Sequence, residues 1–321
     1  DNRGGGNIIL KNVRADEIVV SAESEAGIVE EVDVQIVSPT SAQLTFTKDA
    51  NFYFVIVETP PPTEPMVVAV LGDSQGFNDT LAKMVEEINQ SNAHYLIHLG
   101  DMTPSGAEDE YQTFFTAMSG LNIPWYSVPG NHDVRGDGLN YYKSWLDPTD
   151  YSFDLGDYRF VFLDSSLLGV NSEQMTWLRG VLDSSLETLL FQHVPHYDPR
   201  GHSHSYLDAE EADAFSHLLQ EMQPFGVFAG HIHMFHQKNE NEIQQVISGG
   251  GGALLYAAKE EGGCHHYCLV TLQDTELLVD VFQVEAETYP LSIVVTGRQG
   301  DVEFFATELD EMAVVEREGS F

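Results

Sequence analysis

Side chains that can bind metal follow five apolar runs of this chain, at the point where each run ends. Aspartate follows the first two runs, asparagine the third and histidine the last two. The segments are Asp73-Ser74-Gln75, Gly100-Asp101, Gly130-Asn131-His132-Asp133, His193 and Gly230-His231-Ile232-His233. A single aspartate after an apolar run is usually a turn residue or a helix cap. Five such endings in one chain instead predict a metal-binding site.

The apolar runs have the length of β-strands, and from Met66 onward they alternate with stretches of helical period. The runs are Val67–Leu71, Tyr95–Leu99, Trp125–Val128, Leu189–Gln192 and Gly226–Ala229. This alternation is typical of a sheet with helices packed on it. Sites in α/β folds form where the carboxyl ends of strands converge, so the polar segments are expected to lie within reach of one another. Apolar stripes at 79–90, 111–118, 178–182 and 215–222 predict helix faces in the core.

Both flanks of this α/β region are β-prone and lack a helical period. The β-prone stretches are Asn7–Leu10, Glu17–Ser21, Val32–Val37, Gln43–Thr47, Phe52–Val57, Leu291–Val295, Val302–Ala306 and Met312–Val315. The proline-rich stretch 59–65 cannot continue a strand ladder. We therefore predict a small β-rich N-terminal module over 1–59, a linker over 60–65, an α/β domain over 66–285 and a β-rich C-terminal extension over 286–321.

The chain is strongly acidic, with 51 acidic and 14 basic residues and a formal charge of -37. Such a surface repels phosphate backbones, which argues against binding a nucleic-acid polymer. No apolar run reaches the ~18 residues of a transmembrane helix. The charge fits a protein adapted to high salt (halophilic), or a secreted, periplasmic or cell-surface protein, or it serves only solubility.

The first residues resemble a flexible tether, Asp1-Asn2-Arg3-Gly4-Gly5-Gly6. Such a segment is expected just after the cleavage point of a signal peptide or a lipid anchor. We therefore expect a secreted, periplasmic or cell-surface location, with the cytoplasm of a salt-adapted organism as the alternative. Oligomeric state is left open by the sequence.

Two cysteines, Cys264 and Cys268, flank His265 and His266. A Cys/His cluster is compatible with zinc, but the second cysteine pair of a structural zinc site is missing. A disulfide or two free thiols is the preferred interpretation. His265 and His266, like His94 and His98, are interpreted as structural.

The five polar segments resemble the motifs of the calcineurin-like metallophosphoesterase superfamily. That pattern runs Asp-x-His, Gly-Asp, Gly-Asn-His-Asp/Glu, an isolated His, and Gly-His-x-His, and this chain matches its order and spacing over roughly residues 66–285. The resemblance implies a four-layer α/β/β/α sandwich. It also implies a phosphoesterase in which two divalent metals generate a bound hydroxide that attacks a phosphate mono- or diester.

The resemblance further implies two ligand sets that share one carboxylate. The first metal would take Asp73, Gln75, Asp101 and His233, and the second Asp101, Asn131, His193 and His231. This mixed nitrogen and oxygen set suits Mn, Fe or Zn better than Ca.

His132 follows a ligand position, so the resemblance places its ring over the metals without binding them. There it would stabilise the phosphoryl group and protonate the leaving oxygen. Asp133 would orient the imidazole, as a carboxylate does for many catalytic histidines. For substrate binding, Arg135, Arg200 and His202 supply scarce cationic or polar groups near the motifs.

The chain departs from the family pattern at Gln75, where a histidine is usual. An amide oxygen is a weaker ligand for a transition metal than an imidazole, so a weaker first site is expected. Pro104 stands where purple acid phosphatases carry a tyrosine, which argues against an iron–tyrosinate centre. The alternative to an enzyme is a non-catalytic metal-binding or scaffold protein on the same fold.

Overall fold

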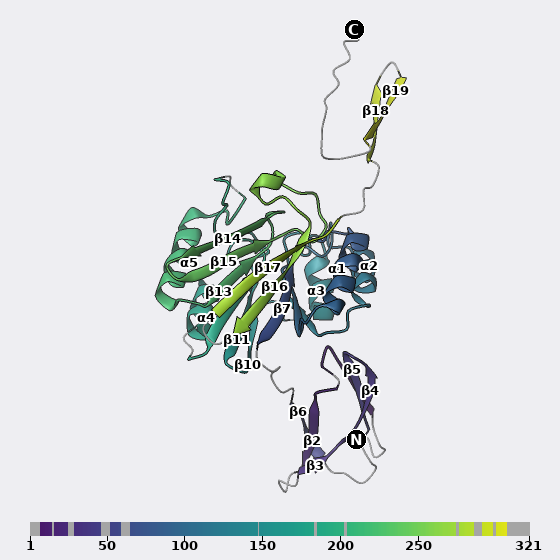
Figure 1. The fold of residues 1–321 in the computed structure, drawn as a ribbon, viewed down its shortest axis with the longest axis vertical. Helices are drawn as coiled ribbons and strands as arrows, with labels where there is room; N and C mark the ends of the chain where they lie inside the picture. The colour runs from purple at the N-terminus through teal and green to yellow at the C-terminus, as the bar shows by residue number, and fades with distance from the viewer. Residues whose placement is uncertain are drawn as a thin grey trace. The chain divides into compact units, whose positions relative to one another are not determined.

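The computed structural model describes most of the α/β region and parts of both flanks (Figure 1). The described residues are 7–14, 16–24, 29–45, 52–58, 65–146, 148–182, 185–201, 204–273, 276–285, 291–297 and 300–306. The chain forms two compact units, residues 1–284 and 285–321. The predicted linker lies almost wholly outside the described residues, so the boundary at 60–65 stays a prediction.

The first sheet of the larger unit contains the three strands that precede Asp73, Asp101 and Asn131. Its order is β17-β16-β7-β8-β9, with β7, β8 and β9 parallel and β16 antiparallel to both of its neighbours. The bounds are β7 Met66–Leu71, β8 Tyr95–His98, β9 Trp125–Ser127, β16 His266–Gln273 and β17 Glu276–Gln283. Every residue of β7 and β8 is buried, which is why these strands read as continuous apolar runs.

The second sheet contains the strands that precede His193 and His231. Its order is β10-β11-β12-β13-β15-β14, parallel from β11 to β15 and antiparallel at both edges. The bounds are β10 Tyr151–Leu155, β11 Tyr158–Leu163, β12 Glu187–Gln192, β13 Gly226–Ala229, β14 Phe235–Glu240 and β15 Ile243–Ser248. The five predicted strands are therefore confirmed, but they belong to two sheets.

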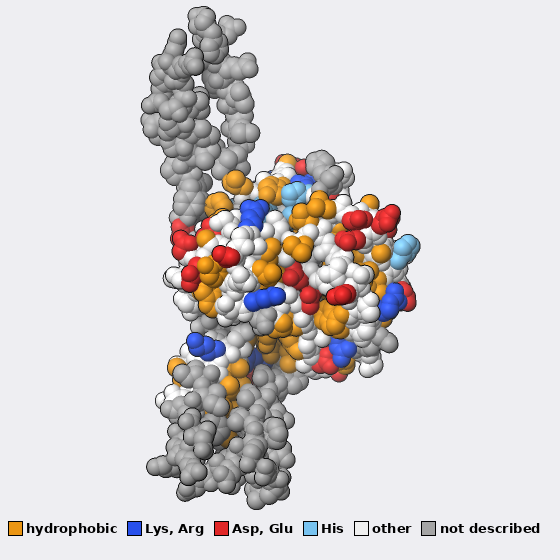
Figure 2. Space-filling view, turned by 180° about the vertical axis from the view of Figure 1, so that it is seen from behind, with side chains coloured by type: hydrophobic (Ala, Val, Ile, Leu, Met, Phe, Trp, Pro, Cys, Tyr) orange, Lys and Arg blue, Asp and Glu red, His pale blue; other side chains and the backbone are white. Residues whose placement is uncertain are grey.

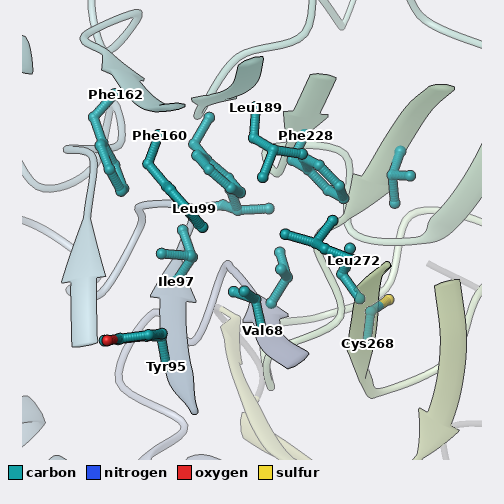
Figure 3. Packing of buried hydrophobic residues seen from close by; sticks show 14 of the residues in the cluster. Val68, Tyr95, Ile97, Leu99, Phe160, Phe162, Leu189, Phe228, Cys268 and Leu272 are labelled. Carbon is teal, nitrogen blue, oxygen red and sulfur yellow. The ribbon is translucent and has the colours of Figure 1, made fainter. Parts of the chain in front are cut away.

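A layer of buried apolar side chains joins the two sheets (Figure 3). Phe160, Phe162 and Phe228 from the second sheet face side chains such as Ile97 and Leu99 from the first. Phe191 lies among these rings, with centroids 5.2 Å from Phe162 and from Phe228. Because the ring stack spans adjacent parallel strands, it holds those strand ends in register.

Helices cover the outer face of each sheet, which completes four layers (Figure 1). α1 Asn78–Gln90, α2 Glu108–Met118 and α3 Gly138–Leu146 pack on the first sheet, and α4 Ser172–Leu182 and α5 Ala209–Met222 on the second. The structure confirms the predicted α/β/β/α sandwich, and the four apolar stripes are helix faces in its core. Helix α5 begins at Asp208, whose side chain accepts hydrogen bonds from two first-turn backbone N–H groups. Helix α3 was not predicted.

The β-prone flanks also form strands. The N-terminal ones make two three-stranded sheets, β1-β5-β4 and β3-β2-β6, and the C-terminal ones pair as β18 with β19. The bounds are β1 Asn7–Lys11, β2 Val19–Ser24, β3 Val29–Glu31, β4 Asp33–Ser38, β5 Ser41–Thr45, β6 Phe52–Glu58, β18 Leu291–Gly297 and β19 Gly300–Ala306. Strand β3 was not predicted, and Met312–Val315 lies outside the described residues.

The segment with the two cysteines places His266 in the interior, and the structural role of His265 and His266 stays a prediction. Cys264 and Cys268 are both free thiols. His266 is buried, its Nδ1 lies 2.9 Å from the carbonyl of Cys264, and its Nε2 lies 3.1 Å from Ser248 Oγ. A short 3-10 turn, Lys259–Glu261, precedes this segment. Among the described helices, none combines the length and apolarity that crossing a membrane requires.

We predict that Phe191→Ala destabilises the fold by about 3–5 kcal/mol, because it opens a cavity in the layer between the sheets. Urea denaturation monitored by circular dichroism measures this loss. Leu167→Ala is the matched control, since Leu167 is 83% exposed and should change stability by less than about 0.5 kcal/mol. Equal effects of the two substitutions would contradict this assignment of the core.

Candidate metal centre

Two groups of potential metal ligands lie at the carboxyl ends of strands from the two sheets. One group is Asp73, Asp101 and His233, and the other is Asp101, His193 and His231. Within each group, the candidate donor atoms lie within 4.8 Å of one another. Asp101 belongs to both groups, which agrees with the shared ligand that the resemblance implies.

Several of these residues occupy the left-handed backbone region, which non-glycine residues rarely adopt. The φ angles are 66° at Asp73, 40° at Gln75, 55° at Asp101 and 66° at His231. Hydrogen bonds hold the first two loops together: Asp73 N–H donates to the Gly100 carbonyl, and Gln75 N–H to that of Asp101, each at 2.9 Å. Such conformations persist only where the surroundings determine them, and they concentrate at functional sites.

Glycine is required where the loops pass closest to the carboxylates. A Cβ atom on Gly230 would stand 2.5 Å from Asp73 Oδ2, and one on Gly130 would collide with the Asp101 carboxylate. The absent side chains let the His231 N–H approach both Asp73 oxygens, at 2.9 and 3.1 Å. Close approach of backbone to carboxylate thus explains Gly130 and Gly230, whereas Gly100 has a positive φ of 92° and lies against the Gly130 backbone and the His193 ring.

Backbone carbonyls orient two of the candidate ligands. Nδ1 of His193 lies 2.8 Å from the Leu99 carbonyl, and Nδ1 of His233 is hydrogen-bonded to that of Leu254. A carbonyl only accepts, so each Nδ1 carries a proton, and each Nε2 is the atom that could bind a cation once it has lost its proton. The Nε2 atoms point inward, at 3.4 Å from Asp101 Oδ1 and from Asp73 Oδ1 respectively. This donor arrangement fits bound divalent cations, whose histidine ligands are typically oriented in this way.

The electrostatics of the centre are dominated by burial and by opposed charges. Burial would raise the pKa of Asp101, but the nearby imidazoles of His193 and His132 hold it below its usual range. Burial would lower the pKa of His193, but the Asp101 and Asp73 carboxylates raise it to about 9. Burial and the proximity of His193 lower the pKa of His231 to about 2, which keeps that imidazole neutral.

The two predicted amide ligands lie beside these groups. Asn131 places Oδ1 3.1 Å from His193 Nε2, next to the second group. Gln75 lies next to the first group, but its amide nitrogen donates to Asp101 Oδ2 at 2.8 Å and lies 3.4 Å from His233 Nε2. An amide nitrogen does not bind a cation. Gln75 is therefore arranged here as a hydrogen-bond donor to the shared carboxylate, and its role as a ligand stays a prediction.

His132 lies at the mouth of the centre with its side chain 21% exposed. Its Nδ1 is 2.7 Å from the Pro104 carbonyl, and its Nε2 is 2.8 Å from Arg135 Nη2 and 4.0 Å from Asp101 Oδ2. The ring therefore faces the shared carboxylate from the solvent side, where a substrate could meet it.

The prediction that Asp133 orients His132 is wrong. The Asp133 carboxylate instead accepts hydrogen bonds from the N–H groups of Met102, Thr103 and Gly130 and from the Thr103 hydroxyl. Burial and the neighbouring Asp101 raise the pKa of Asp133 to about 7. Asp133 ties the loop after β8 to the loop after β9, and the Pro104 carbonyl takes over the orienting contact.

The predicted substrate contacts have different surroundings. Arg135 is exposed and beside His132, as a phosphate contact should be. Arg200 is committed elsewhere: it forms a bidentate pair with Asp198, and its Nη1 donates to the Tyr256 carbonyl at 3.1 Å. These contacts do not support phosphate binding by Arg200. His202 lies outside the described residues.

Two aromatic residues at the centre were not among the predicted site residues. His204 stacks on His231 with ring centroids 4.4 Å apart, and Tyr256 stacks on His233 at 4.0 Å. No motif marks either position: His204 lies in the polar loop after His193, and Tyr256 follows the glycine run 249–252.

Curated relatives are bacterial phosphodiesterases of low identity. A glycerophosphodiester phosphodiesterase of Enterobacter lignolyticus is 26% identical over 181 residues, which are 49% of this chain and 64% of that one. A cyclic adenosine monophosphate phosphodiesterase of Vibrio vulnificus is 26% identical over 151 residues, 43% of this chain and 54% of that one. The chain thus spans little more than half the length of such relatives.

A solved structure shares the fold of this chain, and a family profile matches its α/β region. A purple acid phosphatase from yellow lupin shares the fold with a TM-score of 0.60 at 14% identity, over 90% of this chain and 71% of that one. The profile of the calcineurin-like phosphoesterases matches residues 66–235, which include the five ligand-bearing strand ends. The chain belongs to the calcineurin-like phosphoesterase family.

Proposed function

We propose that this protein hydrolyses phosphate esters at a centre of two divalent metals. The observation that supports this most directly is the pair of donor groups that share Asp101. The names of the curated relatives favour phosphodiesters over phosphomonoesters as substrates. The chemistry expected of metals bound there is polarisation of a phosphoryl oxygen and a lowered pKa of a water. The mixed donor set favours Mn, Fe or Zn.

The protein's own groups then position the ester and move a proton. Asp101 would help to hold both metals, since it belongs to both donor groups, and its negative charge would offset the repulsion between neighbouring cations. Pro104 holds the Nδ1–H of His132, so the Nε2 side of the ring is the one that can meet the substrate. We assign to the imidazolium form of His132 the transfer of its Nε2 proton to the leaving oxygen as the P–O bond of the ester breaks, once Arg135 has moved from Nε2. Arg135 would exchange its contact with His132 for a phosphoryl oxygen.

We predict that His132→Ala lowers kcat by roughly 10²–10⁴-fold, the usual contribution of a general acid. Hydrolysis of a generic aryl phosphodiester by the metal-loaded protein measures this, together with metal content by elemental analysis, which should be unchanged. The matched control is His217→Ala, on the exposed side of α5. Metal-free protein that stays inactive after metal addition would support the scaffold alternative instead.

Gln75→His is expected to tighten the first metal site by roughly tenfold or more, the scale seen when groups around a metal ligand are altered. The substitution replaces an amide donor to Asp101 with an imidazole nitrogen that can itself bind the metal. Metal titration by calorimetry compares the two proteins, with Gln75→Ala as the control that removes the amide without adding a ligand. Equal affinity of wild type and Gln75→His would sink the idea.

Added salt should lower KM for an anionic ester. The formal charge of -37 repels such a substrate at long range, and salt screens this repulsion. On the face shown in Figure 2, acidic side chains are scattered among apolar ones, so the repulsion is not confined to one patch. Steady-state kinetics between low and high sodium chloride test this, with sucrose as the control for osmolarity. A doubly charged monoester should respond more than a singly charged diester, and a KM that rises with salt would contradict the prediction.

A further inference from the structure

Tyr256 has an aromatic ring built into the wall of the metal centre. The ring stacks on His233 with centroids 4.0 Å apart and planes 14° apart. The ring of His204 meets it edge-on at 5.1 Å. Tyr256 is still 44% exposed, so the ring borders both the first donor group and solvent.

Backbone contacts on both sides fix the position of this residue. The Tyr256 N–H donates to the His233 carbonyl at 3.2 Å, and its own carbonyl accepts from Arg200 Nη1 at 3.1 Å. Asp198 holds Arg200 through two hydrogen bonds of 2.9 and 3.0 Å. The Arg200–Asp198 pair therefore helps to fix the backbone of Tyr256, although arginine is scarce in this chain.

The phenol hydroxyl of Tyr256 is a potential donor beside the first donor group. A tyrosine hydroxyl keeps its proton near neutral pH, so it can donate a hydrogen bond. It has no hydrogen bond to any other described residue, and it is therefore available to a ligand.

We propose that Tyr256 is a substrate-contacting residue whose hydroxyl donates a hydrogen bond to a phosphoryl oxygen of the ester. This inference deepens the proposed function and rests on it. A neutral donor suits this protein, because it has only 14 basic residues. It also suits this position, since a cation there would compete for the carboxylates that form the donor groups. Tyr256 and Arg135 then supply donors to the phosphoryl group, one uncharged and one charged.

Tyr256→Phe tests the proposal, because it removes the hydroxyl and keeps the ring stacked on His233. We expect kcat/KM for an aryl phosphodiester to fall roughly 10- to 100-fold, the scale of a hydrogen bond to a charged group. The affinity for inorganic phosphate, measured by calorimetry on the metal-loaded protein, should fall to a similar extent. Metal content should not change.

The matched control is Tyr141→Phe, which removes a hydroxyl from α3, where Tyr141 stacks on Trp145. It should leave both readouts unchanged. Unchanged phosphate affinity and kcat/KM in Tyr256→Phe would overturn the inference, and so would metal-loaded wild type that does not bind phosphate. Failure of the proposed function looks different: wild type would bind metal and phosphate but hydrolyse no ester, and the phosphate affinities of the two proteins would still test Tyr256.

Discussion

The shared carboxylate of Asp101 is the interaction on which the rest of the centre depends. Its two oxygens serve different neighbours: Oδ1 accepts from the His132 N–H at 2.8 Å and faces His193, and Oδ2 accepts from Gln75. Both donor groups therefore contain this one side chain. Its backbone is in the left-handed region, with φ at 55°, a conformation that persists only where the surroundings determine it.

The two donor groups that share Asp101 combine residues from both sheets. The Asp73 and Asp101 loops follow β7 and β8 of the first sheet, whereas His193, His231 and His233 follow strands of the second. Hydrogen bonds cross the seam, from His193 Nδ1 to the Leu99 carbonyl and from the His231 N–H to Asp73. The buried layer between the sheets, which includes Phe162 and Phe191, fixes the strand ends of one sheet relative to those of the other. Packing remote from the chemistry thus sets distances between ligands.

Some charged side chains around this centre bind other parts of the chain, whereas Arg135 lies at the mouth of the centre. Asp133 and Asp198 are fully engaged in internal hydrogen bonds, to the loop after β8 and to Arg200 respectively. Arg135 remains at the mouth beside His132. In so acidic a chain, the bound metals and a few donors would have to supply the attraction for a phosphate ester.

The sequence by itself determined the strand-end motifs, because these depend on local order along the chain. The resemblance of those motifs to a family pattern then implied the α/β/β/α class, which the structure confirms, and a bridging role for Asp101, which stays a proposal. The sequence paired Asp133 with the wrong partner, gave no sign of the Arg200–Asp198 pair and passed over Tyr256, because the partner of a side chain depends on which loops meet. Asp133 is next to His132 in sequence, yet its carboxylate bonds to Met102 and Thr103 from another loop. Location and oligomeric state stay predictions or open questions, since no contact within the chain bears on them. Only the tertiary structure decided which loops meet, because the packing of two sheets brings together residues more than 150 positions apart, such as Asp73 and His233.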